Sequence, residues 1–118
     1  MPRSWGDIHE FYDSILPSIP WLHGILELVQ RIEDSPHASH LFAFTSMHDL
    51  CITQTLTSDP PYLRISARKD ASLEFRFVDA YIAEQQWHRV VSPTEGFARL
   101  ESFMNQLHWV GKVPGAAS

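Results

Sequence analysis

The chain has 118 residues, of which 44% are hydrophobic and 19% charged, and its formal net charge is −5. This composition is typical of one folded domain and unlike a disordered chain. The acidic balance argues against a nucleic-acid binder, which normally shows a large basic patch. The only cysteine is Cys51, so an intrachain disulfide and a four-cysteine zinc site are excluded. No signal peptide is recognisable, and no apolar run approaches the ~18 residues that span a bilayer, so we predict a cytoplasmic protein without membrane contact.

Two helices are predicted before residue 36. The first begins after the N-cap residue Ser4 and ends at the prolines of the run LPSIP. The second extends from Trp21 to about Asp34, and its apolar residues follow spacings of three and four. Residues 1–36 carry six acids and two bases. This acidic segment would suit a basic partner protein.

Four antiparallel strands are predicted from the sequences HLFAFTS, LCITQTL, YLRISA and SLEFRFV, between residues 40 and 78. In the last two strands apolar residues alternate with Arg64, Ser66, Glu74 and Arg76, which is the period-2 pattern of half-buried strands. The run QWHRVV, residues 86–91, favours a fifth strand, although its alternation does not say which side is buried.

Charge selects a register for the hairpin between residues 62 and 78. Pairing Ile65 with Phe75 would set Arg64 against Arg76, whereas pairing Ile65 with Leu73 sets Arg64 against Glu74. Because like charges placed directly opposite each other are unfavourable, we predict the second register, with residues 68–70 as the turn.

The turn of the first hairpin can be predicted from which of its residues share a face of the sheet. If Phe42 and Phe44 lie on the buried side with Leu50 and Ile52, the turn must hold an odd number of residues. This predicts a three-residue turn at Met47, His48 and Asp49.

The final helix has the clearest local signal in the chain. Ser92, Pro93 and Glu95 form the pattern of a capping box, and an apolar stripe from Phe97 to Leu107 follows, with Gly111 as a stop. We therefore predict one α+β domain over residues 1–112, followed by a flexible tail at 113–118. Its parts are two N-terminal helices, an antiparallel meander sheet of four to five strands, and a C-terminal helix packed on one sheet face.

Seven histidines invite a metal or catalytic interpretation. His37 and His40 are three residues apart, but Pro36 interrupts the helix that would bring them together. His9 and Asp13, four apart on the first helix, favour a surface ion pair. No complete ligand set or cofactor motif is present, so we predict neither a bound metal nor a cofactor.

Two further patterns resemble nucleophile sites but lack the necessary context. Ser46, His48 and Asp49 have the residue types of a hydrolase triad, yet neighbours on one turn point in different directions. Cys51 has no recognisable activating group, so we predict a small side chain on the sheet face opposite Leu50 and Ile52.

These observations favour a non-catalytic protein that binds a partner protein, as inhibitors and immunity proteins do, through its sheet face or its acidic helices. Self-association as a homodimer is a further expectation, because strand 41–46 is apolar on both faces. The alternative is a small enzyme or ligand-binding protein with a pocket between sheet and helices, using His48, Tyr62 and His88. The predicted binding residues are Leu41, Thr53, Tyr62, Arg64, Glu74 and Arg76.

Overall fold

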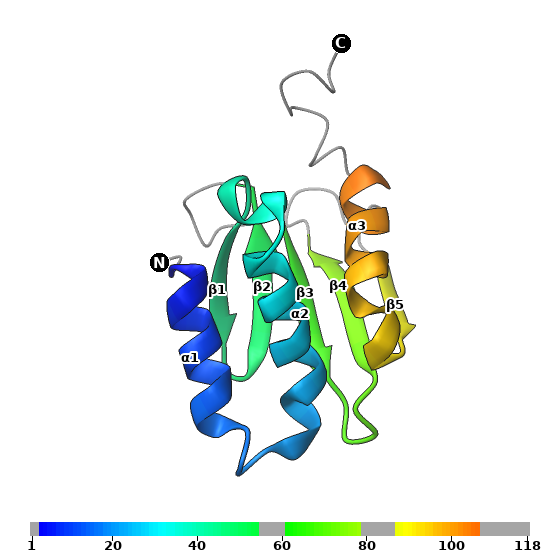
Figure 1. The fold of residues 1–118 in the computed structure, drawn as a ribbon. Helices are drawn as coiled ribbons and strands as arrows, with labels where there is room; N and C mark the ends of the chain where they lie inside the picture. The colour runs from blue at the N-terminus through cyan, green and yellow to red at the C-terminus, as the bar shows by residue number, and fades with distance from the viewer. Residues whose placement is uncertain (1–2, 55–60, 79–86, 107–118) are drawn as a thin grey trace.

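Among the described residues, a five-stranded antiparallel sheet forms one layer and three α-helices form the other (Figure 1). The computed structural model describes residues 3–54, 61–78 and 87–106. The strands follow one another in sequence order across the sheet. They are β1 (Phe42–Ser46), β2 (Asp49–Thr53), β3 (Tyr62–Ala67), β4 (Leu73–Val78) and β5 (Trp87–Val91).

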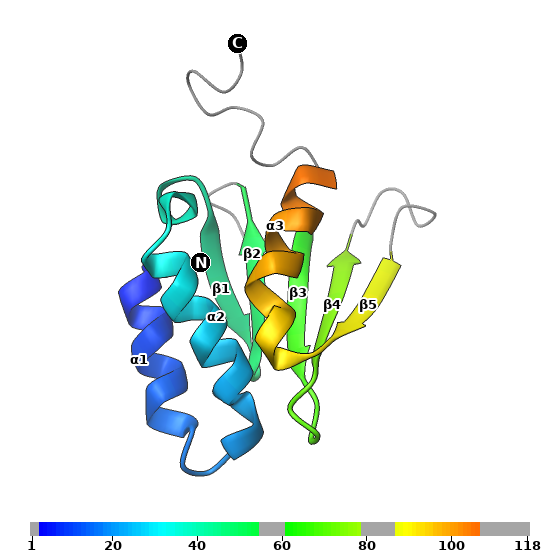
Figure 2. The ribbon, with the colours of Figure 1, turned by 45° about the vertical axis from the view of Figure 1, so that its right-hand side comes forward.

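The helices α1 (Trp5–Ile15), α2 (His23–Glu33) and α3 (Gly96–Gln106) lie on the same side of the sheet in both views (Figures 1 and 2). Short 3₁₀ turns precede α2 (Pro20–Leu22), follow it (Pro36–Ser39) and precede α3 (Pro93–Glu95). The predicted α+β arrangement is therefore confirmed. Most of the predicted loop 57–61, the helix end near Gly111 and the tail 113–118 lie outside the described residues.

Helix α1 starts where its cap predicts, whereas α2 and α3 each begin a few residues later than predicted, after a 3₁₀ turn. The Ser4 hydroxyl accepts a hydrogen bond from the Asp7 backbone N–H at 3.1 Å, which caps α1. Pro20 opens the 3₁₀ turn before α2. Before α3, the Glu95 backbone N–H bonds the Ser92 carbonyl, and the Ser92 hydroxyl lies 3.3 Å from the Glu95 carboxylate.

The core lies between the helices and the facing side of the sheet. Phe75 of β4 is fully buried and packs its ring 5.1 Å from that of Phe103 in α3. Each helix contributes an apolar stripe to this core. The fully buried helical residues are Ile8, Tyr12, Ile25, Val29, Ile32, Leu100 and Met104.

The first hairpin differs from the prediction. Ser46 pairs with Asp49, so the turn holds only Met47 and His48, and Met47 has a φ of 56°. Two-residue turns of this kind match the twist of the flanking strands. The prediction of a three-residue turn was therefore wrong. The prediction that Phe42 and Phe44 lie on the buried side was wrong for the same reason.

The small side chain of Ala43 explains this register. Ala43 is fully buried beneath the helices, and Phe42 and Phe44 therefore face the other side. Helix α1 packs against β1 here, where the Trp5 indole N–H donates to the Leu41 carbonyl at 3.1 Å. A short side chain at this position leaves room for the helix, which a phenylalanine would occupy.

The predicted register of the second hairpin was also wrong. Ile65 lies opposite Phe75, and Arg64 lies opposite Arg76. The turn spans residues 68–72, in which the Asp70 carboxylate accepts hydrogen bonds from the Ser72 N–H at 3.0 Å and its hydroxyl at 2.6 Å. Ala71 in this turn takes the left-handed conformation, with a φ of 69°.

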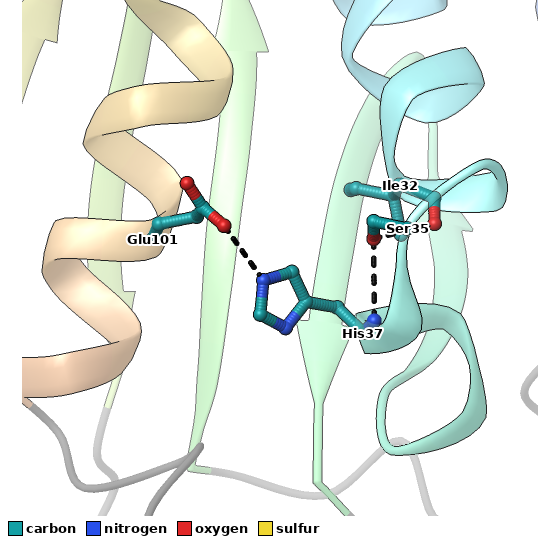
Figure 3. A network of polar contacts seen from close by, with 4 residues as sticks. All are labelled: Ile32, Ser35, His37 and Glu101. Carbon is teal, nitrogen blue, oxygen red and sulfur yellow. Dashed lines mark hydrogen bonds and ion pairs between the residues drawn. The ribbon is translucent and has the colours of Figure 1, made fainter.

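Two histidine–carboxylate contacts join neighbouring helical segments. His9 Nδ1 lies 2.6 Å from Glu33 Oε1 of α2, so its partner is not the predicted Asp13. His37 Nε2 lies 2.9 Å from Glu101 Oε2 of α3 (Figure 3). These contacts link α1 to α2, and the turn after α2 to α3.

The outer edge of β1 is partly closed by the chain that precedes α1. The Arg3 backbone N–H donates to the Ala43 carbonyl at 2.7 Å and forms an isolated antiparallel bridge. At the other edge, β5 pairs with β4. The fifth strand is thus confirmed, and its register places Val91, which is buried, on the helical side.

Candidate functional site

The sheet face turned away from the helices gathers most of the residues predicted to bind a partner. We call it the open face, because no described helix or strand covers it (Figures 1 and 2). Strand alternation and register assign its members. They are Phe42, Phe44, Ser46, Asp49, Cys51, Thr53, Tyr62, Arg64, Ser66, Glu74, Arg76, Val78 and Val90.

Five of the six predicted binding residues lie on this face, and one does not. The five are Thr53, Tyr62, Arg64, Glu74 and Arg76, but Thr53 is only 2% exposed and is therefore buried beneath the surface of this face. Leu41 is only 1% exposed and belongs to the core on the helical side. Its placement on a binding surface was wrong, because it precedes β1 at the point where Trp5 packs against the chain.

A cluster of three charged side chains occupies the centre of the open face. The Asp49 carboxylate accepts a hydrogen bond from Arg64 Nε at 2.7 Å, and the same oxygen lies 4.0 Å from an Arg76 terminal nitrogen. Burial opposes the charged guanidinium, but the hydrogen bond that Arg64 donates to Asp49, together with the attraction of the Asp49 charge, outweighs burial and raises the pKa of Arg64. One carboxylate therefore offsets the repulsion between two opposed arginines.

The three members of this cluster are not equally engaged. Asp49 and Arg64 are 21% and 23% exposed, whereas Arg76 is 44% exposed and has no ion pair shorter than 4.0 Å with a described residue. Glu74, two positions away on β4 and half-buried, forms no ion pair with any residue of the described ranges. Arg76 and Glu74 thus retain capacity for further charged partners.

Aromatic and aliphatic side chains lie beside the charged cluster. The rings of Phe44 and Tyr62 meet edge to face, with centroids 5.4 Å apart and planes at 80°. Tyr62 is also paired with Val78, and Val90, opposite Glu74, is 51% exposed. Tyrosine and arginine next to apolar side chains is the composition that protein interfaces favour.

Cys51 lies beneath this surface between Phe44 and Arg64, its neighbours on the adjacent strands. Its side chain is fully buried, and burial raises the pKa of the Cys51 thiol to about 11, although the Arg64 charge acts in the opposite direction. A thiol in this state is protonated at neutral pH and is a poor nucleophile. The predicted role as a small side chain on the sheet face agrees with its position.

The other candidate groups do not converge on one point. Ser46 lies opposite Asp49, whose carboxylate is bound to Arg64, while the His48 carbonyl accepts the Tyr12 hydroxyl at 3.0 Å. Burial holds the pKa of that Tyr12 hydroxyl above its usual range. Within the described ranges, no three histidine, cysteine or acidic side chains are grouped as metal ligands.

One cavity of about 340 Å³ opens between α2 and the start of α3 rather than between sheet and helices. The Arg31 guanidinium stacks over the Phe97 ring at 4.7 Å beside it. Neither His48 nor Tyr62 lines this cavity, and the His88 side chain lies outside the described atoms. The cavity is lined by Glu27, Leu28, Gln30, Arg31, Thr94 and Phe97.

Comparisons with protein-family models, curated proteins and solved structures find no match to this chain. Among the helices that the structure describes, none has the length and apolar character needed to cross a bilayer.

Sequence reasoning did not include two members of this face among the binding residues. Asp49 was assigned to a turn, and Phe44 was assigned to the core. The signal that was available is the unpaired positive charge of Arg64 and Arg76, which requires a nearby acid once the two arginines share a face. Asp49, directly after the first turn, is in position to supply it.

Proposed function

We propose that this chain is a non-catalytic binding protein whose open face contacts another protein. The observation that carries the proposal is a sheet whose described helices all lie on one side, while its other side combines Phe44 and Tyr62 with incompletely neutralised Arg76. Interface hot spots are enriched in tyrosine and arginine that lose water contact on binding. Small inhibitors and immunity proteins would use a surface of this type.

The exposed acids on the helices offer a second docking surface for the same function. Asp7, Glu10 and Asp13 are exposed on α1, so a basic partner would be attracted there. Solvent and salt screen such exposed charges strongly. The aromatic residue described beside these acids, Phe11, is half-buried. The open face therefore has the stronger support.

The enzyme alternative receives less support from the same geometry. Its three proposed residues would have to line one pocket, but Tyr62 lies on the open face and His48 in the turn after β1. Among its described lining residues, the cavity between α2 and α3 has a stacked arginine, one carboxylate (Glu27) and one hydroxyl (Thr94), and no hydrogen bond joins the last two as a base and a nucleophile.

The test compares one variant on each surface. The wild type, Arg76→Ala and Glu10→Ala are immobilised, and proteins retained from a lysate of the source cells are identified. A protein bound through the open face is retained by the wild type and Glu10→Ala but reduced at least about fivefold on Arg76→Ala. The purified protein then gives a dissociation constant for each variant.

Retention that is equal on all three proteins would contradict the open-face assignment. Loss on Glu10→Ala alone would move the binding surface to the acidic helices. Turnover of a small molecule by the purified chain, abolished by Arg31→Ala, would favour the enzyme alternative.

A further inference from the structure

The open face carries a positive and a negative side chain at neighbouring positions. A second copy turned by 180° therefore presents the opposite charge to each of them. Arg76 and Glu74 are two residues apart on β4, so their side chains leave the same face about 7 Å from each other. Neither has a close ion pair with a described residue. A surface whose described residues leave one positive charge only partly paired and one negative charge without an ion pair is complementary to a second copy of itself.

Two-fold symmetry is the geometry that uses this order. In a closed dimer, if a residue i contacts residue j of the second copy, then j contacts i as well. An axis passing between positions 74 and 76 therefore forms two equal pairs, with Arg76 of each copy facing Glu74 of the other. The apolar neighbours Val78, Val90 and Tyr62 flank these pairs and lose water contact in the same event.

The size of the face determines how tight such a dimer can be. Five strands spaced by about 4.8 Å, each about five residues long, give a face of roughly 400 Å² per copy. A standard stable interface uses about 800 Å² per partner. The contact is therefore small, and its dimer exchanges readily with monomer.

We propose that, when no partner is bound, two copies close face to face over the open face through reciprocal Arg76–Glu74 pairs. This inference rests on the proposed function, because it assigns a second copy to the same surface. A weak dimer covers Phe44 and Tyr62 in the unbound protein and gives way to a tighter partner by mass action. The partner then competes with dimerisation, and its apparent affinity falls as the chain becomes more concentrated.

The test is a charge exchange between copies. Glu74→Arg and Arg76→Glu are each examined by sedimentation velocity from about 10 to 300 µM, alone and as an equimolar mixture. The wild type is expected to shift from monomer to dimer over this range. Each variant alone places like charges against each other and should dimerise at least about tenfold more weakly, whereas the mixture restores opposite charges and regains the dimer.

The matched control is Glu27→Arg, which reverses an exposed acid on α2 and should leave dimerisation unchanged. Circular dichroism verifies that each variant is folded, and Arg76→Gln replaces Arg76→Glu if the latter unfolds, with weaker dimerisation again expected. A wild type that stays monomeric at 300 µM overturns the inference, as does a mixture that dimerises no better than its components. Both results are independent of the retention experiment that compares the wild type with Arg76→Ala. Failure of the dimer is therefore distinguishable from failure of the proposed function.

Discussion

The two faces of the sheet differ in what their side chains contribute. On the helical side, Ile65 and Phe75 are fully buried and meet apolar residues from the helices. On the open face, Phe44 and Tyr62 are half-buried, and Arg76 is 44% exposed. Apolar burial is the main favourable term in folding. The helical side thus supplies most of the stability, whereas the open face leaves aromatic and charged groups partly in contact with water.

The largest expected effect comes from comparing one phenylalanine on each face. Phe75→Ala should lower the free energy of unfolding by about 3 to 5 kcal/mol, because it removes buried contacts and leaves a cavity. Phe44→Ala should cost only about 1 kcal/mol, since that ring is already partly in water. Urea denaturation measures both. Equal losses would show that the open face is covered as fully as the core.

The charged cluster offers a comparison within the open face. Asp49→Asn should lower stability by about 2 kcal/mol, because Arg64 loses its hydrogen-bonded carboxylate and faces Arg76 without compensation. Adding Arg76→Gln should recover part of the loss by removing the repulsion. Glu74→Gln serves as the control with little effect. If Asp49→Asn is neutral, the carboxylate does not stabilise the observed register.

Alkaline pH distinguishes a thiol buried beneath the open face from an exposed one. Burial raises the pKa of Cys51 from its ordinary 9.0 to about 11, so above pH 9 the unfolded chain loses a proton that the folded chain keeps. Stability is therefore complete below pH 9 and should fall by about 1.4 kcal/mol near pH 10 from this group alone.

The matched variant for this prediction is Cys51→Ala, which lacks the titrating thiol. Its stability should fall less than that of the wild type between pH 8 and pH 10, as measured by denaturation at each pH. Staying below pH 10 limits the contribution of Tyr12, whose pKa is also raised by burial. Parallel profiles would indicate that the Cys51 thiol is accessible in the folded state.

The smallest effect is expected in the helical layer. Glu101→Gln removes the charged partner of His37, but Glu101 is 46% exposed and the pair is screened by water. The free energy of unfolding should change by less than about 0.5 kcal/mol, close to that of the control Glu27→Gln. A loss above about 1 kcal/mol would mean that this contact is a main attachment of α3.

Sequence patterns predicted the elements and their order but not the pairing within either hairpin. The alternation in β3 and β4 identified the buried face correctly, because Leu63, Ile65, Leu73 and Phe75 are all fully buried. The register failed because the charge rule was applied to two strands only. Asp49, on a third strand, contacts both arginines and reverses the outcome.

The first hairpin failed for a reason of shape. Hydrophobicity assigns Phe42 and Phe44 to the core, but the approach of α1 selects the smaller Ala43 for that side. Which side-chain size fits beneath a helix depends on contacts between residues far apart in the sequence, such as Trp5 and Leu41, which are 36 positions apart. Most of the candidate site could be placed on one face from the sequence, because this placement needs no distant contact. Local alternation within each strand is enough to set Tyr62, Arg64, Glu74 and Arg76 on the same face.

The hydrogen bond from Arg3 to Ala43 has a consequence for aggregation. An edge strand presents free N–H and C=O groups that can recruit strands of other molecules into fibrils. By occupying the Ala43 carbonyl, the segment before α1 interrupts this row near the start of β1. The same few residues that precede the first helix therefore also make the edge of β1 less available for pairing with strands of other molecules.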